Sequence, residues 1–452
     1  MDTDSATTTA FRQADSRWIV YGGIASLFLY SAFWLLQIDI SKAGGGLMIF
    51  FFLLAMFSKQ RGAFLREPIL YVFIAWILFQ FGVYLWSADT FPELRDGHIR
   101  EARIITYIFM FVVVAWWLGG STKRAVAIIS LCAIGYILKA TFSNSGLLVE
   151  LSEYREYSRL TLGYKNWEHA SVYSAFIFLS LLIFKRRITS YVHEKFKWVA
   201  IALIYLALTY SVIAIIATKT RATWLGLLVS GAIFIIGYTL SKLKKYRSGS
   251  VESKSDFSSK NLLGFGIVLI IVIAAAISFN AHELIMKRVT QERDVVTKML
   301  AGNNEEIPYS SIGIRINLWD KGIDWFIQRP FTGWGPQSRK ALLTQSSLPT
   351  WVAEKYRHMH NSYIELIVSY GIIGLALFAF LFTYIWFRAL QAWKAGYIPN
   401  DIMLFAGTWT IYWLIVNSFE SYIIYSETGP YINAIVAGML YSYHLKRHVN
   451  KC

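Results

Sequence analysis

Long apolar runs recur along nearly the whole chain, and short polar connections separate them. A helix that crosses the hydrocarbon core of a bilayer needs about 20 predominantly apolar residues, and the runs have about that length. Only helices and closed barrels satisfy backbone polar groups in lipid, and these runs are too long for barrel strands. The pattern therefore predicts an all-α, polytopic integral membrane protein.

The runs predict about 12 transmembrane helices in three parts of the chain. The expected spans lie near residues 18–37, 45–58, 68–87, 103–119, 124–142, 170–184, 197–217, 222–240, 262–280, 363–387, 401–418 and 430–444. Residues 1–280 would hold helices 1–9, and residues 281–362 would form a long loop with short amphipathic helices. Residues 363–452 would hold helices 10–12 and a cytoplasmic tail.

Composition and charge agree with a bilayer environment. The chain is 56% hydrophobic, and its net charge of +16 would otherwise suggest a nucleic-acid-binding protein. In a membrane protein, however, lysine and arginine in short loops set the orientation. With the termini inside, inside segments hold 23 of the 44 lysines and arginines, short outside loops hold ten, and the long loop holds eleven. We therefore expect cytoplasmic termini and no nucleic-acid partner.

Neither the N-terminus nor the cysteines change this picture. The first eighteen residues are polar and not basic, and no small-residue cleavage site follows. The first apolar run is therefore expected to be a retained helix. Cys132 lies inside an apolar run and Cys452 is the last residue, so the cysteines predict neither a disulfide nor a metal site.

The long loop contains one segment with helical periodicity. Its apolar residues Ile316, Trp319, Ile323, Phe326 and Ile327 predict a short amphipathic helix whose apolar face lies on the bundle or in the membrane interface. The following segment RPFTGWGPQS, residues 329–338, is rich in proline and glycine and predicts a turn.

Two groups of cations are expected on the outer face. Lys219 and Arg221 lie in TKTRATW, in a linker too short for them to leave the membrane surface. They either face a cavity or partner or extend to lipid headgroups. Arg315 follows Ser310 or Ser311, either of which could cap the amphipathic helix. An arginine there is disfavoured unless an anion is also present, although it could equally be a solvated surface charge.

A third polar group is the stretch RHMHNSYIE, which leads into an apolar run. His358 and His360 could bind a metal, but the other outside histidines, at 98, 169 and 282, show no ligand spacing. No metal is therefore expected. Asn361 or Ser362 is predicted to cap the helix, and Glu365 in its first turns could accept a hydrogen bond from a histidine.

The order of three motifs resembles the O-antigen ligase and O-antigen polymerase superfamily. The motifs are TKTRATW, then IRINLWDKGIDWFIQRPFTGWG, then HMHNSYIELIVSYGIIG, within roughly residues 200–380. The superfamily consists of bacterial integral membrane glycosyltransferases with about twelve helices and a long periplasmic loop late in the chain. The resemblance implies the same fold and the bacterial inner membrane, with the active site facing the periplasm.

The resemblance also implies the substrates and the site. A ligase moves a glycan from undecaprenyl pyrophosphate to a sugar hydroxyl of the lipid A–core, which completes lipopolysaccharide. Carried over to this sequence, Arg221 and Arg315 are the essential arginines and His360 is the essential histidine. His360 is preferred because it directly precedes the asparagine. Lys219, His358, Asn361, Arg159 and Lys165 are further substrate-binding candidates, the last two on a poor local match.

Elementary chemistry fits this interpretation. Nucleotide sugars are absent outside the cytoplasm, so a periplasmic transferase needs an activated donor that arrives in the membrane. Arginines would hold the negative charge that grows on the departing pyrophosphate, and His360 would act as general base. One displacement would invert the anomeric centre. Neither a metal nor another cofactor is required, because the arginines hold the phosphates.

Three alternatives remain open at this point. An O-antigen polymerase would use the same donor with a second lipid-linked glycan as acceptor. A protein O-glycosyltransferase of the same superfamily would use a protein acceptor. A twelve-helix transporter predicts charges near mid-membrane and a repeat with paired broken helices, whereas the charges here cluster at one face and no repeat is visible.

Overall fold

The computed structural model describes residues 17–57, 65, 67–143, 146–152, 159–247, 295, 297–298, 307–425 and 427–449. Within those ranges the ordered elements are helices and no strand occurs. The α-helices are α2 (Arg17–Trp34), α3 (Ile38–Met56), α5 (Pro68–Thr90), α6 (Arg95–Thr106), α7 (Met110–Leu118), α8 (Thr122–Phe142), α9 (Leu147–Ser152), α10 (Trp167–Tyr191), α11 (Lys197–Ala217), α12 (Arg221–Arg247), α15 (Ser311–Gln328), α16 (Ser338–Thr344), α17 (Thr350–Lys355), α18 (Ser362–Lys394), α19 (Asn400–Val416) and α20 (Gly429–Val449). The 3-10 turns are Pro92–Leu94, Tyr107–Phe109, Glu194–Phe196 and Tyr422–Ile424.

These helices confirm an all-α polytopic membrane protein. In the described part of the chain, seven helical runs are long and apolar enough to cross a membrane. They are Ile38–Met56, Pro68–Thr90, Pro92–Leu118, Thr122–Phe142, Trp167–Tyr191, Glu194–Ala217 and Ser362–Lys394. The expected count of twelve stays a prediction, and the expected span 262–280 lies outside the described residues.

Two expected spans have different bounds. The helix expected at 45–58 begins at Ile38, because helix α3 continues into a polar turn where Lys42 bonds Asp39. The span expected at 103–119 is broken into α6 and α7 by a 3-10 turn. Residues 95–102, expected in a loop, are helical in α6, and their Glu101 is buried against Arg339.

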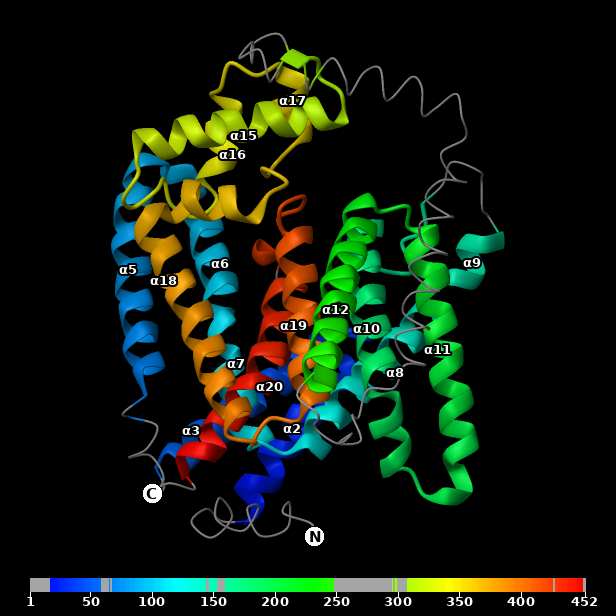
Figure 1. Ribbon diagram of the computed structural model, residues 1–452. Helices are drawn as coiled ribbons and strands as arrows, with labels where there is room; N and C mark the ends of the chain where they lie inside the picture. The colour runs from blue at the N-terminus through cyan, green and yellow to red at the C-terminus, as the bar shows by residue number, and fades with distance from the viewer. Residues whose placement is uncertain are drawn as a thin grey trace.

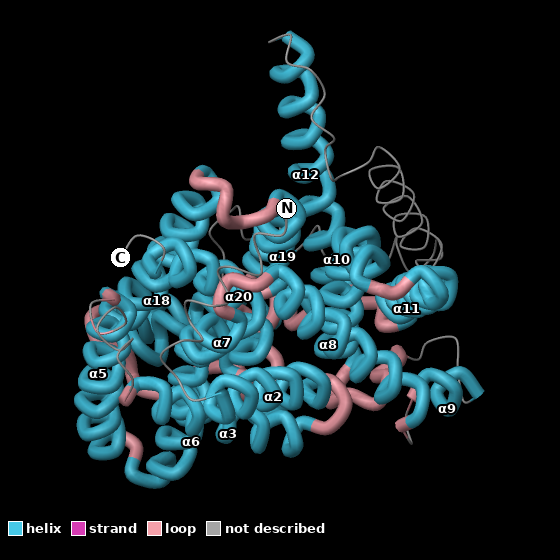
Figure 2. Tube along the Cα trace, turned by 90° about the horizontal axis from the view of Figure 1, so that it is seen from below, coloured by secondary structure: helices cyan, strands magenta, loops and turns pink. Residues whose placement is uncertain are grey.

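The helices form a bundle with a cap at one end. The start of α2 and the end of α20 lie at the same end, at the bottom of Figure 1, and α15, α16 and α17 lie across the other end. We call the end with α15–α17 the outer end. Seen along the bundle, α20 lies near the centre, with α7, α18, α19 and α10 around it (Figure 2). The start of α2 and the end of α20 therefore lie on the same side of the bundle, opposite the cap.

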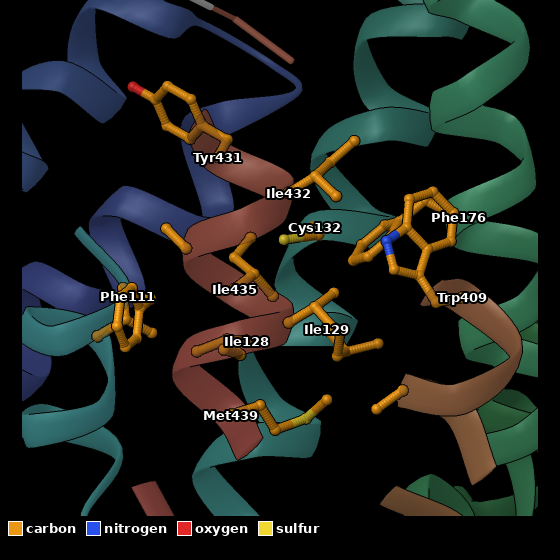
Figure 3. Packing of buried hydrophobic residues seen from close by; sticks show 14 of the residues in the cluster. Phe111, Ile128, Ile129, Cys132, Phe176, Trp409, Tyr431, Ile432, Ile435 and Met439 are labelled. Atoms are coloured by element: carbon orange, nitrogen blue, oxygen red, sulfur yellow. The ribbon is translucent and has the colours of Figure 1, made fainter. Parts of the chain in front are cut away.

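The bundle core forms where α20 packs on its neighbours. Ile432, Ile435 and Met439 of α20 lie beside Ile128 and Ile129 of α8, and all five side chains are buried (Figure 3). Since lipid is as apolar as these side chains, close packing rather than burial from water holds the helices together.

The cap has a small core of its own. Buried residues from α15, α16, α17 and the outer part of α18 make one cluster, namely Phe91, Ile314, Leu318, Trp325, Leu342, Leu343, Leu348, Val352, Met359 and Val368. Helix α15 confirms the predicted amphipathic helix, and Ser310 caps it by accepting a hydrogen bond from the Gly313 amide.

Only part of the apolar face expected for α15 packs in the cap, where Trp319 contacts the cluster. Ile323 and Ile327 are exposed, whereas Ile314, Leu318, Gly322 and Trp325 are buried. Gly322 explains the difference, because a Cβ there would lie 2.6 Å from Ile364. The helix approaches α18 most closely at this glycine. A pattern of apolar residues leaves glycine out, so it could not predict which face makes this contact.

Helix α18 is interrupted at Gly371, and the predicted turn 329–338 fills the gap. Gly371 has φ +60° and ψ −161°, which breaks the helical hydrogen bonds. The turn replaces them, since its Trp334 and Gly335 amides donate to the Val368 and Ser369 carbonyls at 2.8 and 2.9 Å. In return, the Ile372 and Ile373 amides donate to the Pro330 and Phe331 carbonyls at 2.7 and 3.2 Å. The two backbones are therefore joined directly.

The contact leaves no room for side chains, so Gly371→Ala should destabilise the protein. A Cβ at Gly371 would lie 2.4 Å from the Phe331 carbonyl oxygen, and the positive φ adds strain. We expect a loss of about 1–3 kcal/mol, seen as a lower melting temperature in detergent. The control is Gly407→Ala in α19, where a Cβ meets nothing within 4 Å and should be neutral or stabilising. Equal stability of the two variants would contradict the tight junction.

Candidate active site

Two histidines and a glutamate meet at the outer end, where the start of α18 approaches the loop between α19 and α20. One carboxylate oxygen of Glu420 lies 2.7 Å from Nδ1 of His360, and the other lies 2.8 Å from Nε2 of His358. The two imidazole rings are 4.1 Å apart, centroid to centroid. Glu420 is buried, and both histidines are partly exposed. We call these three residues the His–Glu cluster.

The cluster fixes the proton positions on His360. Burial alone would raise the pKa of Glu420, but hydrogen bonds from His358 and His360 hold that pKa well below its ordinary value. The carboxylate is therefore ionised at neutral pH and can only accept hydrogen bonds. Nδ1 of His360 must then carry a proton, which leaves Nε2 of the neutral ring with its lone pair. A histidine in this state can take a proton from a hydroxyl.

The backbone turns sharply at His360. Its φ of +50° lies in the left-handed region, which costs a non-glycine residue of order 1 kcal/mol or more. Asn361 then begins α18, and its side chain accepts hydrogen bonds from the Tyr363 and Ile364 amides at 3.0 and 3.3 Å. Its predicted role as helix cap is confirmed. The turn points the imidazole at Glu420 while the helix leaves in another direction.

Glu365 binds the backbone of the histidine motif and does not bind a histidine side chain. Its Oε1 accepts hydrogen bonds from the Met359 amide at 2.5 Å and the Ser421 hydroxyl at 3.0 Å. Its Oε2 lies 2.8 Å from Nε of Arg339. The prediction that Glu365 orients a histidine is therefore wrong, because a buried arginine and the backbone take its oxygens. Glu420 binds the histidines instead.

Arg339 joins this carboxylate to a second one. Its two terminal nitrogens donate to the two oxygens of Glu101 in α6 at 2.7 and 2.8 Å. Burial would lower the pKa of Arg339, but Glu101 and Glu365 hold that pKa above its ordinary value. Removing one partner from such a buried group costs about 3–5 kcal/mol, so the pairing fixes α6, α16 and α18 together.

A second carboxylate of the site comes from α10. Asn166 caps that helix by accepting a hydrogen bond from the His169 amide at 2.9 Å, which places Glu168 in the first turn at the outer end. Glu168 interacts electrostatically with Glu420, His360, Arg315 and Arg159. The predicted residues Arg315 and His360, 45 positions apart in the sequence, are thus near one acidic group.

Lys165 and Arg159 also lie beside this group of residues. Nζ of Lys165 lies 4.6 Å from the ring centroid of Tyr425, whose hydroxyl is 3.4 Å from Nε2 of His358. The guanidinium of Arg159 lies 5.3 Å from the ring of Trp167. The structure therefore places these two weakly matched candidates in the segment that borders the His–Glu cluster.

Lys219 and Arg221 lie at the outer end on a different helix. Arg221 begins α12 and is exposed, and Lys219 has a positive φ of +50° (Figure 1). Two residues further, Thr223 accepts a hydrogen bond at 3.2 Å from Tyr412 of α19, the helix whose outer end leads to Glu420. This contact joins the start of α12 to α19, whereas Arg315 lies on α15.

The His–Glu cluster has the composition of a metal site. One ligand atom each of His358, His360 and Glu420 lie within 4.8 Å of one another. The sequence argument against a metal rested on a missing third ligand, and Glu420 supplies one. The nitrogen–oxygen distances of 2.8 and 2.7 Å are, however, those of charge-assisted hydrogen bonds, which satisfy the same atoms.

Sequence reasoning missed Glu168 and Glu420. Glu420 is the one charged residue between positions 402 and 426, in a stretch of apolar and aromatic residues. An isolated carboxylate at a membrane boundary is rare and marks a functional candidate. Glu168 follows a clear cap, Asn166, but its neighbours could not be known without the fold.

One comparison with known proteins identifies the central part of the chain. Residues 206–379 match the model of the family described as O-antigen ligase. This segment is similar to the O-antigen ligase family. It carries Arg221, Arg315 and His360, whereas Glu168 and Glu420 lie outside it. No curated protein sequence matches the chain. The O-antigen ligase family match and the apolar helices together support a multi-pass membrane glycosyltransferase of the ligase or polymerase type.

Because Glu420 holds His360 in one tautomer, Glu420→Gln should lower glycan transfer about a hundred- to ten-thousand-fold. The neutral amide can still bond the histidines, so we expect the melting temperature to change little. Transfer is measured with a lipid-linked glycan donor. Glu427→Gln is the control, since Glu427 is an exposed carboxylate in the same loop. Full activity of the Glu420 variant would remove the carboxylate from its positioning role.

Proposed function

We propose that the protein is an O-antigen ligase. It transfers a glycan from undecaprenyl pyrophosphate to a sugar hydroxyl of the lipid A–core. The observation that carries the proposal is the His360–Glu420 pair at the outer end, next to Arg315 and within a bundle whose central segment has the family's sequence. The outer end would face the periplasm, with both termini in the cytoplasm, in the bacterial inner membrane.

The cations would hold the donor. A polyisoprenyl pyrophosphate places its negative charges at the membrane surface, where Arg221 begins α12 and Arg315 lies in the first turns of α15. A guanidinium remains charged at any physiological pH and binds two phosphate oxygens at once. Lys219, Arg159 and Lys165 would add positive charge around the same headgroup. Such fixed charges act most strongly on the leaving group, because its negative charge grows as the bond breaks.

The histidine would activate the acceptor. Nε2 of His360 takes the proton of the acceptor hydroxyl while that oxygen forms a bond to the anomeric carbon of the donor. The bond between this carbon and the phosphate oxygen breaks, and undecaprenyl pyrophosphate leaves with the bonding electrons. A single displacement inverts the anomeric centre. Glu420 stabilises the imidazolium that forms, and His358 and Asn361 line the acceptor side.

No metal is part of this proposal. Two functions of a cation, neutralising the pyrophosphate and activating the hydroxyl, are assigned to arginines and to His360. Nδ1 of His360 is occupied by Glu420 at 2.7 Å, and Nε2 is the nitrogen that must receive the proton. Coordination through Nε2 would remove the base.

The acceptor decides between ligase and polymerase. We expect purified protein to consume lipid-linked glycan only when lipid A–core is added, and to form core-linked glycan together with free undecaprenyl pyrophosphate. His360→Ala should abolish this product while the protein still inserts and elutes as a folded species. Lengthening of the lipid-linked glycan without core would instead identify a polymerase. Transfer at the normal rate by the alanine variant would remove His360 from the role of base.

Arg315 can be tested against a neighbouring arginine. Arg315→Gln should raise KM for the donor and lower kcat, with kcat/KM falling about a hundredfold, because a charge-assisted contact to the leaving group is lost. Arg357→Gln is the control, since Arg357 is exposed directly before the histidine motif. Kinetics are measured over a range of donor concentrations. Equal values for the two variants would show that Arg315 acts only as surface charge.

A further inference from the structure

A groove with mainly apolar walls runs down the bundle below the candidate site. It has a volume of about 290 Å³ and lies between α18 and α19, with α20 and the start of α7 as its floor. Aromatic side chains form much of its wall, namely Phe111, Phe378, Trp386, Trp409 and Trp413. Such a surface binds hydrocarbon in preference to polar groups.

The outer end of the groove adjoins the His–Glu cluster. Tyr363 and Asn417 line that end. The Asn417 side chain accepts a hydrogen bond at 2.6 Å from Ser362, and the Ser362 hydroxyl also lies 3.1 Å from the Glu420 carbonyl oxygen. One serine side chain therefore connects the wall of the groove with the loop that carries the catalytic carboxylate.

The groove is also open toward the surrounding lipid. Its edges include Phe382 and Leu414, which are 45% and 41% exposed. Along the part of α18 that follows the break at Gly371, its lining extends from Leu375 to Trp386, which is about 17 Å at 1.5 Å per helical residue. This is about half the thickness of a bilayer core, so the groove spans roughly one leaflet.

We propose that this groove binds the polyisoprenyl tail of the donor. The inference rests on the proposed function and locates the lipid half of its substrate. The tail must begin at the pyrophosphate and descend into the leaflet, and the groove begins at the candidate site and follows that path. One narrow channel suits a single chain, as in the donor. The several acyl chains of lipid A need a broader surface.

Filling the groove should remove the advantage of a long tail. We compare kcat/KM for donors that carry the same glycan on an undecaprenyl or a geranyl pyrophosphate. In the unaltered protein the long tail should be favoured by about tenfold or more, which burial of a few methylene groups already supplies. In Ala379→Trp and Ala437→Trp, both in the lining, the ratio should fall to near one.

Ala376→Trp provides the matched control, because Ala376 is an exposed alanine of α18 outside the lining. It should keep the preference for the long tail. Unchanged ratios in all three variants would overturn the groove assignment and leave the glycosyltransferase function intact. Absence of transfer from either donor in the unaltered protein would instead contradict the proposed function.

A photoreactive undecaprenyl pyrophosphate gives a second, activity-independent readout. We expect crosslinked peptides from α18, α19 or α20, and a loss of crosslinking in Ala379→Trp. Crosslinks confined to other helices would overturn the assignment. Equal competition by phosphatidylglycerol would show a groove for any lipid chain. Crosslinking of a photoreactive lipid A at the same residues would assign the groove to the acceptor. Competition by phosphatidylglycerol and crosslinking of lipid A would each contradict a donor-specific site.

Discussion

The junction between the interrupted α18 and the turn 329–338 determines the geometry of the outer end. A break in a membrane helix leaves backbone groups unpaired, and each such group costs several kcal/mol in lipid. Here the turn supplies the missing donors and acceptors from its own backbone, and Gly371 and Gly333 allow the two chains to touch. This junction fixes the direction of the outer part of α18. It therefore also fixes the position of the histidine motif directly before that helix. The indole of Trp319 in α15 also donates to the Met359 carbonyl at 2.9 Å, so the helix with Arg315 is tied to the same unit.

Two kinds of buried carboxylate can be distinguished at this end. Glu101 and Glu365 share one buried arginine, and their carboxylates also accept bonds from backbone amides and, in Glu365, from a serine hydroxyl. Removing any one partner of these buried charges would be costly, so the charges hold the helices together. Glu420 instead pairs with two partly exposed histidines. The same residue type is structural in one case and suited to catalysis in the other, because the partners differ in exposure and in their ability to move a proton.

Sequence alone predicted the class of fold, the helical caps at Ser310 and Asn361, the turn at 329–338 and the family. These features follow from local patterns, such as apolar runs, capping residues and glycine–proline clusters. The interruption at Gly371 could not be predicted, because an apolar run looks continuous when the hydrogen bonds come from a distant turn. The partner of the histidines was also assigned wrongly. Glu365 is near in sequence, but a helix beginning at Ser362 directs it to Arg339, whereas Glu420 arrives from a loop 60 positions away. The partner of a polar side chain and the interruption of a helix depend on contacts between distant segments. The periodicity of a sequence carries no information about those contacts.

The separation of Arg221 from the His–Glu cluster agrees with the stereochemistry of the proposed reaction. In a single inverting displacement, the attacking and leaving oxygens lie on opposite sides of the anomeric carbon. His360 lies on the turn before α18 and Arg221 begins α12, with α19 connected to both through the Thr223–Tyr412 and Ser362–Asn417 contacts. A sugar ring held between these elements would meet the acceptor on one face and release pyrophosphate on the other. The apolar groove proposed for the donor tail would then also receive the tail of the leaving group, so that a water-facing reaction and a lipid-soluble product would share one boundary.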